Sequence, residues 1–533
     1  RAFFTVMLVV VAAYALRALL YFVITYWGHT FGIRVEADIR AALFGHMQEL
    51  GFEFFDRNRT GQLMSRMTTD LFEITELAHH GPEDLFISFA TIVGALAVMA
   101  TIEWRLTLVV AVMIPVFILV SFSRRKAMRT ASRRVKKKTA VINADIESAL
   151  SGIRTAKAFA NEPVEAEKFT RSNDTYKTSK KQFHKEMGIF MGTMEFFTTS
   201  LSVAVVAVGG LLIMQGQMDT VDLLTFTLYI ASFVTPIRKL ANFSELYANG
   251  TAGFERFLEI MRTEPELRDA PDAVDLGRPR GEIGVNDVSF SYDGDLAVLH
   301  DVSLQIPAGQ TVAIVGPSGG GKSTLCQLIP RFYDATAGTV LVDGLDVREY
   351  TFDALYNKLG YVTQKAVLFS GTVEDNVFFG QSAAEKTDAS LQAALSLSQA
   401  AEFVNKYPEK AAHPIAQLGR NVSGGQKQRL SIARALARTP EILIFDDSFS
   451  ALDYKTDATL REGLAKELPG TTKIIVAQRI STIRNADQIL VLDRGEIAGL
   501  GTHDALMASC TVYREIAMSQ LSEEELKKGG ASK

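Results

Sequence analysis

The sequence predicts an all-α transmembrane helical domain fused to an α/β domain that is built around a phosphate-binding loop. The first half contains five apolar stretches separated by charged segments, as membrane-spanning helices require. The second half alternates short apolar strands with helical stretches, which is the pattern of an α/β domain. Within this half, a glycine-rich loop lies between an apolar strand and a helix at 311–329.

The composition sets limits on the class of protein. The 533-residue chain carries 56 basic and 60 acidic side chains, so its net charge gives no argument for nucleic acid as a partner. Cys326 and Cys510 are the only cysteines, which argues against a disulfide framework and fits a reducing compartment. Hydrophobic residues make up 47% of the chain, and the mean hydropathy is positive. The chain is therefore too apolar for an ordinary soluble enzyme.

Five apolar stretches are each long enough to cross the hydrocarbon core, which is ~30 Å thick, at about 1.5 Å of rise per helical residue. The third contains Pro115 and the fifth contains Pro236, but proline is tolerated in membrane helices. Arg17 and Glu195 fall within predicted spans, where structural pairing and substrate contact both remain open. The stretches are 2–27, 85–102, 105–123, 187–214 and 222–238.

Loop charges predict the orientation of the spans in the cell membrane. Basic loops stay on the cytoplasmic side, so segment 124–186 is expected inside and loop 215–221 outside. Residue 1 then lies outside. Either the native N-terminus is outside or one earlier span is missing, and because the sequence begins with Arg1 rather than Met, we expect the missing span. The basic residues of the inner segment are Arg124, Arg125, Lys126, Arg129, Arg133, Arg134, Lys136, Lys137 and Lys138.

Two long helical segments, 28–84 and 124–186, extend between spans on the expected cytoplasmic side. The first contains Phe54–Asp56 and then Thr60–Leu63, and the second contains Gly152–Phe159. Gly61 and Gly152 suit turns at the far tips of helical hairpins. A solvated connector is the simpler interpretation of these tips, but we favour a docking role, because an isolated polar hairpin gains little by itself.

The loop that follows strand 311–315 has the spacing Gly-x4-Gly-Lys-Ser of a phosphate-binding P-loop. Its glycines allow backbone N–H groups to surround phosphate oxygens, and the following helix adds the positive end of its dipole. We expect Lys322 to reach the outer phosphates and the Ser323 hydroxyl to bind Mg²⁺. A glycine-rich turn without a ligand is the weaker alternative. The expected nucleotide-binding residues here are Gly316, Ser318, Gly319, Gly320, Gly321, Lys322, Ser323 and Thr324.

Further candidates surround the P-loop. Strand 442–446 ends in Asp446, which could hold Mg²⁺, and Gln364 follows another strand and could contact the metal or the attacking water. Tyr292 could stack on adenine or be an ordinary core tyrosine. A second anion site is predicted at the start of helix 427–436, and it more naturally meets a phosphate held by another chain. Its residues are Ser423, Gly424, Gly425 and Gln426.

With these motifs in this order, the chain resembles a half-transporter of the ATP-binding-cassette (ABC) exporter family, with the type IV fold. The resemblance identifies Walker A at 316–323, the signature at 422–426, Walker B at 442–446 and the D-loop at 450–453. It implies ATP and Mg²⁺, with Ser323, Gln364 and Asp446 at the metal. It also implies six spans, coupling helices near Phe54–Leu63 and 152–160, and two cassettes that close head to tail over two ATP molecules. The expected domains are a transmembrane domain at 1–262, a linker at 263–281, an ABC nucleotide-binding domain at 282–520 and a tail at 521–533.

Two catalytic positions depart from the family pattern. Asp447 stands where the family usually has the glutamate base, and Gln478 stands where it has the switch histidine. Aspartate is one methylene shorter, and an error of about 1 Å in positioning can cost on the order of 100-fold in rate. Neutral drift in a working homodimer is the alternative. Because both changes affect one step and the binding residues are intact, we expect ATP binding with poor hydrolysis. The signature is nearly regular, so it can complete the site of a partner half-transporter.

The resemblance implies ATP-driven export of a hydrophobic or amphipathic substrate by a heterodimer in the cell membrane, in contact with lipid and with the nucleotide-binding domain in the cytoplasm. Drugs, lipids and peptides remain open as substrates. Two alternatives are an ATP-gated regulatory membrane protein and an importer of a metal chelate. A soluble ATPase acting on nucleic acid is excluded by the spans. Candidate residues for a substrate cavity, which could instead serve packing, are Met191, Met194, Glu195, Phe196 and Phe197.

Overall fold

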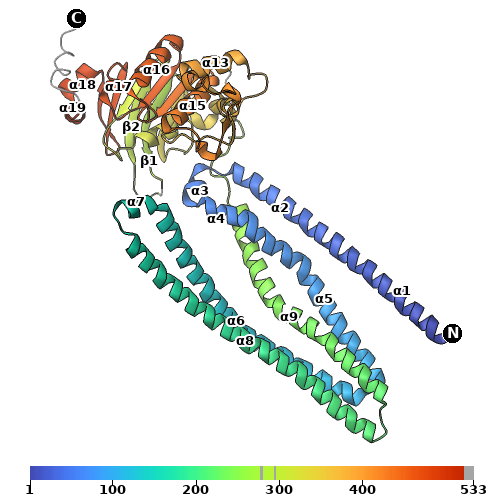
Figure 1. Cartoon of the computed structure of the whole chain (residues 1–533). Coiled ribbons are helices and arrows are strands. Elements are labelled where there is room, and N and C mark those ends of the chain that lie inside the picture. The colour runs from blue at the N-terminus through green and yellow to red at the C-terminus, as the bar shows by residue number, and fades with distance from the viewer. Residues whose placement is uncertain (276–279, 293, 295, 521–533) are drawn as a thin grey trace. The chain divides into compact units, whose positions relative to one another are not determined.

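The computed structural model describes residues 1–275, 280–292, 294 and 296–520 (Figure 1). The chain forms two compact units. Arg1–Gln48 and Thr60–Thr263 make the first unit, while Glu49–Arg59 joins the chain from Glu264 onward in the second. The predicted tail and residues 276–279 of the predicted linker lie outside the described residues.

The first unit contains five helical segments that are long and apolar enough to cross a membrane. Each includes one of the five predicted apolar stretches, so this part of the chain is a multi-pass membrane domain. The segments are α1 (Ala2–Val23) with the π-helical turn η1 (Ile24–Gly28) and α2 (His29–Glu49); α4 (Thr60–Ser65) with the π-helical turn η2 (Arg66–Asp70) and α5 (Leu71–Ile102); α6 (Trp104–Ser151); α8 (Glu162–Met214); and α9 (Thr220–Met261).

The prolines inside these helices do not end them. Pro82 lies within α5, Pro115 within α6 and Pro236 within α9. The chain reverses instead at Glu103, whose extended backbone (φ −151°, ψ 105°) separates α5 from α6. The Glu103 carboxylate accepts the Arg105 N–H at 3.1 Å, which caps the first turn of α6.

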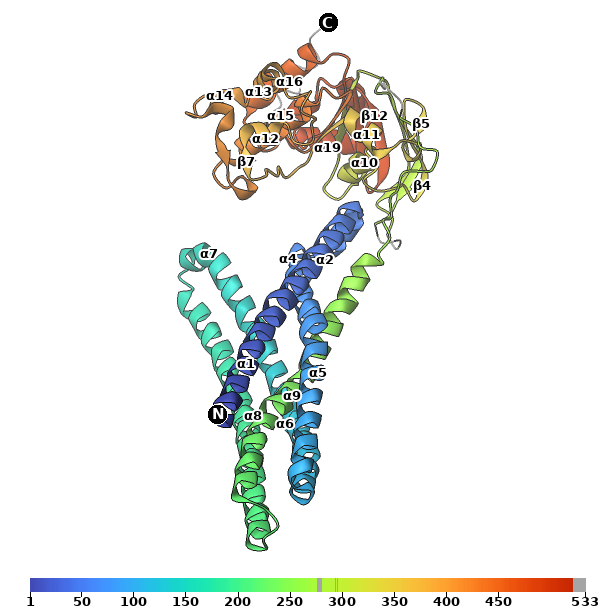
Figure 2. The ribbon, with the colours of Figure 1, turned by 90° about the vertical axis from the view of Figure 1, so that its right-hand side faces the viewer.

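Two helix pairs form the membrane core: α6 runs beside α8, and α5 runs beside α9 (Figure 1 and Figure 2). Polar side chains also join helices, since Arg256 donates two hydrogen bonds of 2.6 Å to the carboxylate of Asp70. By contrast, α1 has no buried residue within the described chain, so its apolar side chains are free to meet lipid or another chain. The core side chains of α6, α8 and α9 include Leu106, Val110, Ile114, Phe117, Leu201, Val205, Phe226, Ile230 and Phe233.

The two hairpin tips differ in how well they were predicted. Gly152 ends α6 and begins the short helix α7 (Ile153–Ala158), as expected for a turn. The prediction of a turn at Gly61 is wrong, because Gly61 lies inside α4. The helical path breaks earlier, at Gly51 before α3 (Phe52–Arg57) and at the extended residue Asn58 after it. A glycine in the first turn of an exposed helix costs too little to end it.

The second unit is organised on a six-stranded sheet with the order β12-β11-β3-β10-β9-β6. Neighbours in this sheet run parallel except β12, which pairs antiparallel with β11. A four-stranded antiparallel sheet, in the order β2-β1-β4-β5, packs beside it. The strands are β1 (Ile283–Phe290), β2 (Leu299–Ile306), β3 (Thr311–Val315), β4 (Ala337–Val342), β5 (Leu345–Asp346), β6 (Leu359–Val362), β9 (Ile442–Asp446), β10 (Thr472–Val476), β11 (Gln488–Asp493) and β12 (Glu496–Gly501).

Successive residues of the central strand face two different cores, as the period of a strand requires. Val312 and Ile314 of β3 pack with α10 (Lys322–Leu328) and the four-stranded sheet, whereas Ala313 and Val315 face a second core. Helices α12 (Val373–Val377), α13 (Asp388–Leu397) and α15 (Gly424–Ala437) lie together over that second core (Figure 2). With both faces covered, the carboxyl ends of the parallel strands present their loops at one edge, where ligands bind in such sheets.

Segment Glu49–Arg59 packs within this second unit. The Phe52 ring stacks on Phe332 with 4.5 Å between centroids, and the Tyr333 hydroxyl donates a hydrogen bond to the carboxylate of Asp56. The chain after Thr263 is also fixed to this unit, because Val274 pairs with Tyr350. The described residues of the predicted linker that precede β1 therefore include an ordered contact with the sheet domain.

Candidate nucleotide-binding site

The P-loop begins with a glycine that no other residue can replace. Gly316 has φ 155°, and a Cβ added there would lie 1.9 Å from the carbonyl oxygen of Leu492. Gly321 closes the loop at φ 91° as the N-cap of α10. The Lys322 ammonium donates hydrogen bonds to the carbonyls of Gly316 (2.9 Å) and Pro317 (2.7 Å) across the loop. Burial lowers the pKa of Lys322, and the carboxylates of Asp447 and Asp446 oppose that shift.

Behind the loop, two oxygen ligands meet at a position suited to a metal ion. The Ser323 hydroxyl donates to Asp446 Oδ1 at 2.7 Å, and the Tyr361 hydroxyl donates to Asp446 Oδ2 at 3.2 Å. Asp446 is only 5% exposed. A hydroxyl and a carboxylate are hard oxygen donors that fit Mg²⁺. Tyr361 was missed in the sequence, although it lies in the strand before Gln364.

The predicted metal ligand Gln364 contacts a different carboxylate. Its amide donates from Nε2 to Asp447 Oδ2 at 3.1 Å. Gln478 donates to the same oxygen at 2.7 Å, so one oxygen of Asp447 accepts two side-chain amides. Asp447 has φ 48° and follows directly after β9. Burial raises its pKa, and the two amide hydrogen bonds oppose this effect.

These residues enclose a cavity of about 240 Å³ at the sheet edge. Gly316 and Asp446 are not among the residues that line it, although Asp446 accepts a hydrogen bond from the lining residue Ser323. Val298 and Val476 also line the cavity, and neither valine carries a local signal of a site in the sequence. The lining residues are Val298, Ser318, Gly319, Gly320, Gly321, Lys322, Ser323, Thr324, Gln364, Asp447, Val476 and Gln478.

Tyr292, the predicted adenine-stacking residue, is not among the residues that line this cavity. Its hydroxyl lies 3.1 Å from the Thr324 hydroxyl and donates to Gln327 at 3.0 Å. Its ring meets the rings of Phe290 and Tyr333 edge-on. The side chain is nevertheless 37% exposed, so one part of it remains open to a ligand.

The signature residues lie outside the cavity as well. Ser423 is the N-cap of α15, where its hydroxyl accepts the N–H of Gln426 at 3.3 Å and the Gln426 side chain accepts the Ser423 N–H at 2.8 Å. This capping box fixes the helix start, and Ser423 and Gly424 are exposed. A Cβ at Gly424 would meet nothing within 4 Å. The helix tip is therefore accessible to another molecule.

A second cavity of about 390 Å³ lies between α6, α8 and α9 in the membrane unit. Of the predicted candidates, Met191, Met194 and Glu195 line it. Phe197 instead stacks on Phe117 with 5.6 Å between centroids, and Phe196 is 68% exposed. Arg17 is exposed on α1, outside this cavity. Arg238 also lines the cavity and was not predicted, although a basic residue at the end of an apolar stretch is a visible signal in the sequence. The lining residues are Phe117, Met191, Gly192, Met194, Glu195, Thr198, Val234, Ile237 and Arg238.

The fold and the site together define a P-loop ATPase fused to a multi-pass membrane domain. Two family models match the chain: the ABC transporter transmembrane region at residues 3–237 and the ABC transporter domain at residues 299–450. The chain belongs to the ABC transporter family, as an exporter half-transporter that joins one membrane domain to one ATP-binding ABC ATPase domain.

Individual relatives agree with this assignment. The chain is 38% identical to the uncharacterised ABC transporter ATP-binding protein YwjA of Bacillus subtilis (strain 168), over 96% of this chain and 89% of the relative. It is 33% identical to the putative multidrug export ATP-binding/permease protein YgaD of the same organism, over 96% and 88% of the two chains. It is also 33% identical to an ATP-dependent lipid A-core flippase of Syntrophus aciditrophicus (strain SB), over 93% and 82%. A bacterial Atm1-family ABC exporter solved with ATP bound is similar in structure, with a TM-score of 0.81 and 26% identity over 98% of this chain and 92% of that one.

Proposed function

We propose that this chain is the catalytically impaired half of a heterodimeric ABC exporter. It holds ATP and Mg²⁺ at its own P-loop, hydrolyses that ATP slowly, and supplies Ser423–Gln426 to the nucleotide site of a partner half-transporter. The proposal depends on one observation: the side chains of Asp447 and Gln478 are hydrogen-bonded to each other at the edge of the cavity.

The Asp447 carboxylate is poorly placed to activate water. Its Oδ2 accepts amide donors from both Gln364 and Gln478, so the two lone pairs of that oxygen are already used in hydrogen bonds and are not free to accept one from a water molecule. The side chain is also one methylene shorter than the glutamate of the family pattern. A base must reach its water within hydrogen-bonding distance, so this shortening affects the chemical step more than nucleotide binding.

Gln478 cannot replace the chemistry of a histidine at this position. An amide donates and accepts hydrogen bonds but carries no charge near neutral pH, whereas an imidazole can. In this chain its donor is already directed at Asp447. Within this chain, stabilisation of charge on the γ-phosphate would then fall to Lys322, Mg²⁺ and the backbone N–H groups of the P-loop. Binding groups are thus retained while two groups that serve hydrolysis are weakened.

The accessible helix tip of α15 supports the role in a partner site. Ser423 and Gly424 lie outside the cavity of their own chain and are exposed. A helix N-terminus with free backbone N–H groups is suited to an anion. A γ-phosphate held on a second chain is the ligand that this arrangement fits best.

For the transported substrate, we propose a hydrophobic or amphipathic molecule that enters between the spans of a bacterial cell membrane, with the ABC domain in the cytoplasm. The cavity between α6, α8 and α9 is mainly apolar but also contains the exposed charges Glu195 and Arg238. The similar putative multidrug export protein and lipid A-core flippase act, by their names, on molecules of this class.

The first test compares ATP binding with ATP hydrolysis in the purified chain in lipid nanodiscs. We expect the wild-type chain to bind ATP but to release phosphate slowly. The variant Asp447→Glu/Gln478→His should bind ATP equally well and hydrolyse it on the order of 10- to 100-fold faster, because it restores the reach and the charge of the catalytic groups. Rapid hydrolysis by the wild-type chain alone, unchanged in the double variant, would contradict the proposal.

A further inference from the structure

Three of the protein's eight histidines gather in the membrane unit, and none of them belongs to the nucleotide site. His29 begins α2, and His79 and His80 lie on α5. One ring nitrogen of each lies within 4.8 Å of the others. The ring centroids are separated by 4.8 Å for His29 and His79, 5.3 Å for His29 and His80, and 4.5 Å for His79 and His80.

Carboxylates complete this cluster. Glu83 Oε2 lies 3.8 Å from His79 Nε2 and 3.4 Å from His80 Nδ1, and Glu76 Oε2 lies 3.9 Å from His80 Nε2. His79 Nε2 is buried and has no hydrogen-bond partner among the described residues. A buried polar atom without a partner is unfavourable, and it is rare enough in folded proteins to require an explanation. A bound ion would provide one, because it would accept the lone pair of His79 Nε2.

The backbone of the neighbouring helix is shaped to admit the His79 ring. A Cβ at Gly28 would lie 2.6 Å from His79 Cε1, and a Cβ at Gly32, one turn later, would lie 3.9 Å from His79 Cβ. Gly28 also ends the π-helical turn Ile24–Gly28, directly before His29. Single π-helical turns often occur at functional sites. Any side chain larger than glycine at position 28 would force the His79 ring to move.

We propose that His29, His79 and His80, together with Glu83, bind one Zn²⁺ ion that fastens α2 to α5. Three imidazole nitrogens and one carboxylate are a donor set that Zn²⁺ binds in tetrahedral geometry. Zn–N bonds of about 2.0–2.1 Å place ligand atoms about 3.4 Å apart. The rings therefore need to approach one another by an ångström or so, which side-chain rotation allows.

Such an ion would connect α2 to α5 near His29, where α2 has no buried apolar side chain among the described residues. Among described residues, α1 buries none, and α2 buries only Leu43 and Met47, four turns beyond His29. His29 follows the apolar stretch 2–27, while His79 and His80 precede the stretch 85–102. The cluster thus lies where the polar and apolar parts of both helical segments meet, with His29 exposed and His79 and His80 half-buried.

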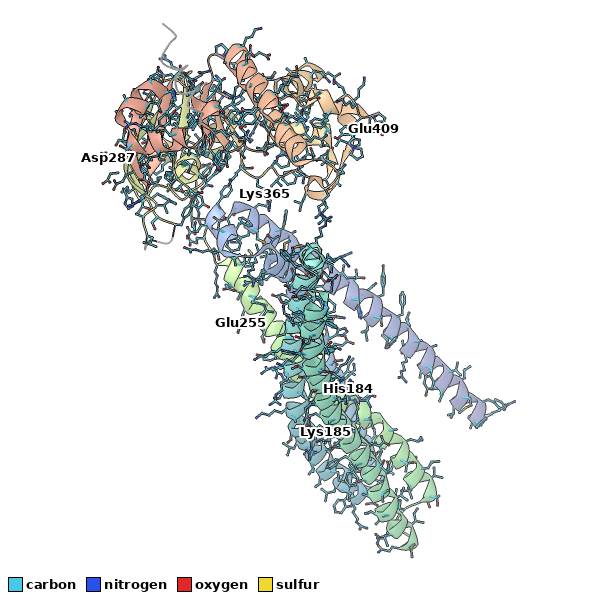
Figure 3. All side chains as sticks on the ribbon, turned by 60° about the vertical axis from the view of Figure 1, so that its left-hand side comes forward. His184, Lys185, Glu255, Asp287, Lys365 and Glu409 are labelled. Atoms are coloured by element: carbon cyan, nitrogen blue, oxygen red, sulfur yellow. The ribbon has the colours of Figure 1, made fainter. Side chains whose placement is uncertain are left out.

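The test measures metal in the full chain, purified in nanodiscs without a histidine tag. After dialysis against Zn²⁺ and removal of free metal, we expect about one Zn²⁺ per chain in the wild type by elemental analysis. His29→Gln/His79→Gln/His80→Gln should retain none. The control His184→Gln changes an exposed histidine on α8 (Figure 3) and should bind like the wild type. ATP binding by each variant shows that its second unit is folded.

A second measurement uses the visible and ultraviolet absorption of bound Co²⁺, so it does not require a variant that has lost metal binding. The wild type loaded with Co²⁺ should show the strong visible absorption of a four-coordinate ion. His80→Cys should add a thiolate-to-Co²⁺ charge-transfer band in the near ultraviolet, and His184→Cys should not. Equal metal content in the wild type and the triple variant would overturn the proposal. So would a weak, octahedral Co²⁺ spectrum, or the absence of the new band in His80→Cys.

Discussion

At the scale of single residues, Asp447 has the most unusual surroundings in the site. Its side chain is 7% exposed, lies near the buried Asp446, and accepts two amides on one oxygen. Burial raises its pKa above the ordinary value for aspartate. The charged form is therefore disfavoured in the folded protein relative to the unfolded chain.

The raised pKa of Asp447 determines how its contribution to the stability of the folded state changes with pH. Because the folded state holds the proton more tightly, the contribution of Asp447 to stability falls as pH rises from its unfolded pKa through its folded pKa. We expect Asp447→Asn to raise the melting temperature of the nucleotide-free protein at pH 7.5, and this gain to shrink as the pH is lowered toward 4. Calorimetry of the ABC domain transition at several pH values measures this.

Asp453 provides a matched control of opposite sign in the same unit. The N–H and hydroxyl of Thr456 donate hydrogen bonds to its carboxylate and lower its pKa. Asp453→Asn should therefore lower the melting temperature at pH 7.5, with a smaller loss at acid pH. If both asparagine variants shifted stability in the same direction at neutral pH, burial would not be the dominant influence on Asp447.

At the scale of secondary-structure elements, the start of α15 links helix stability to the proposed partner site. The Ser423–Gln426 capping box satisfies backbone groups that the first helical turn leaves open. A matching box stands at the start of α13, where the Thr387 hydroxyl accepts the Ser390 N–H at 3.1 Å. The two caps allow the effect of a lost cap to be separated from the effect of a lost ligand contact.

We expect Ser423→Ala and Thr387→Ala to destabilise the ABC domain similarly, by about 1 kcal/mol each, as lost N-caps do. In the Asp447→Glu/Gln478→His background, only Ser423→Ala should also slow ATP hydrolysis, by about tenfold or more, as the loss of a charge-stabilising donor does. Mixing that slow chain with the wild-type chain should restore hydrolysis, because the wild-type chain supplies an intact signature in trans. Phosphate release from the single and mixed preparations measures this, and equal slowing by Thr387→Ala would contradict it.

At the scale of the whole molecule, the chain forms two units. One short segment, Glu49–Arg59, connects α2 to α4 of the membrane unit, yet it packs with the ABC domain. Phe52 on Phe332 and Asp56 with Tyr333 make this contact. Because this segment is fixed to one unit and continuous with the helices of the other, we expect it to transmit movement between them.

We expect Phe52→Ala to weaken this coupling without affecting nucleotide binding. Loss of the aromatic stack removes about 0.5–1.5 kcal/mol beyond the buried area. In the Asp447→Glu/Gln478→His background, transport of a cationic amphipathic dye into inverted vesicles should fall about fivefold or more, while the affinity for ATP stays within twofold. The control Phe55→Ala removes a ring that contacts Phe54 instead. A loss of ATP binding in Phe52→Ala, or an equal transport defect in Phe55→Ala, would disprove the coupling role.

Much of the architecture could be predicted because its signals are local. A run of apolar residues longer than the bilayer core predicts a span wherever it occurs, and all five predicted stretches lie in long helices. Strands 311–315 and 442–446 have the bounds that the sequence predicts. Each is a short apolar run that ends at a glycine-rich loop or at an aspartate, and this pattern can be recognised in the sequence. The prediction failed at Gly61, where the local preference for a turn was too weak to decide the backbone.

The spans, the P-loop and the two unusual catalytic positions follow from the amino-acid sequence alone, because run length, glycine spacing and residue identity are properties of short segments. Which distant side chains meet depends on the folded chain. It brought Gln364 and Gln478 onto one oxygen of Asp447, Arg238 into the cavity with Glu195, and His29 beside His79 and His80. Contacts of this kind depend on how sheets and helices pack, and packing is set by the whole chain rather than by any one stretch of it.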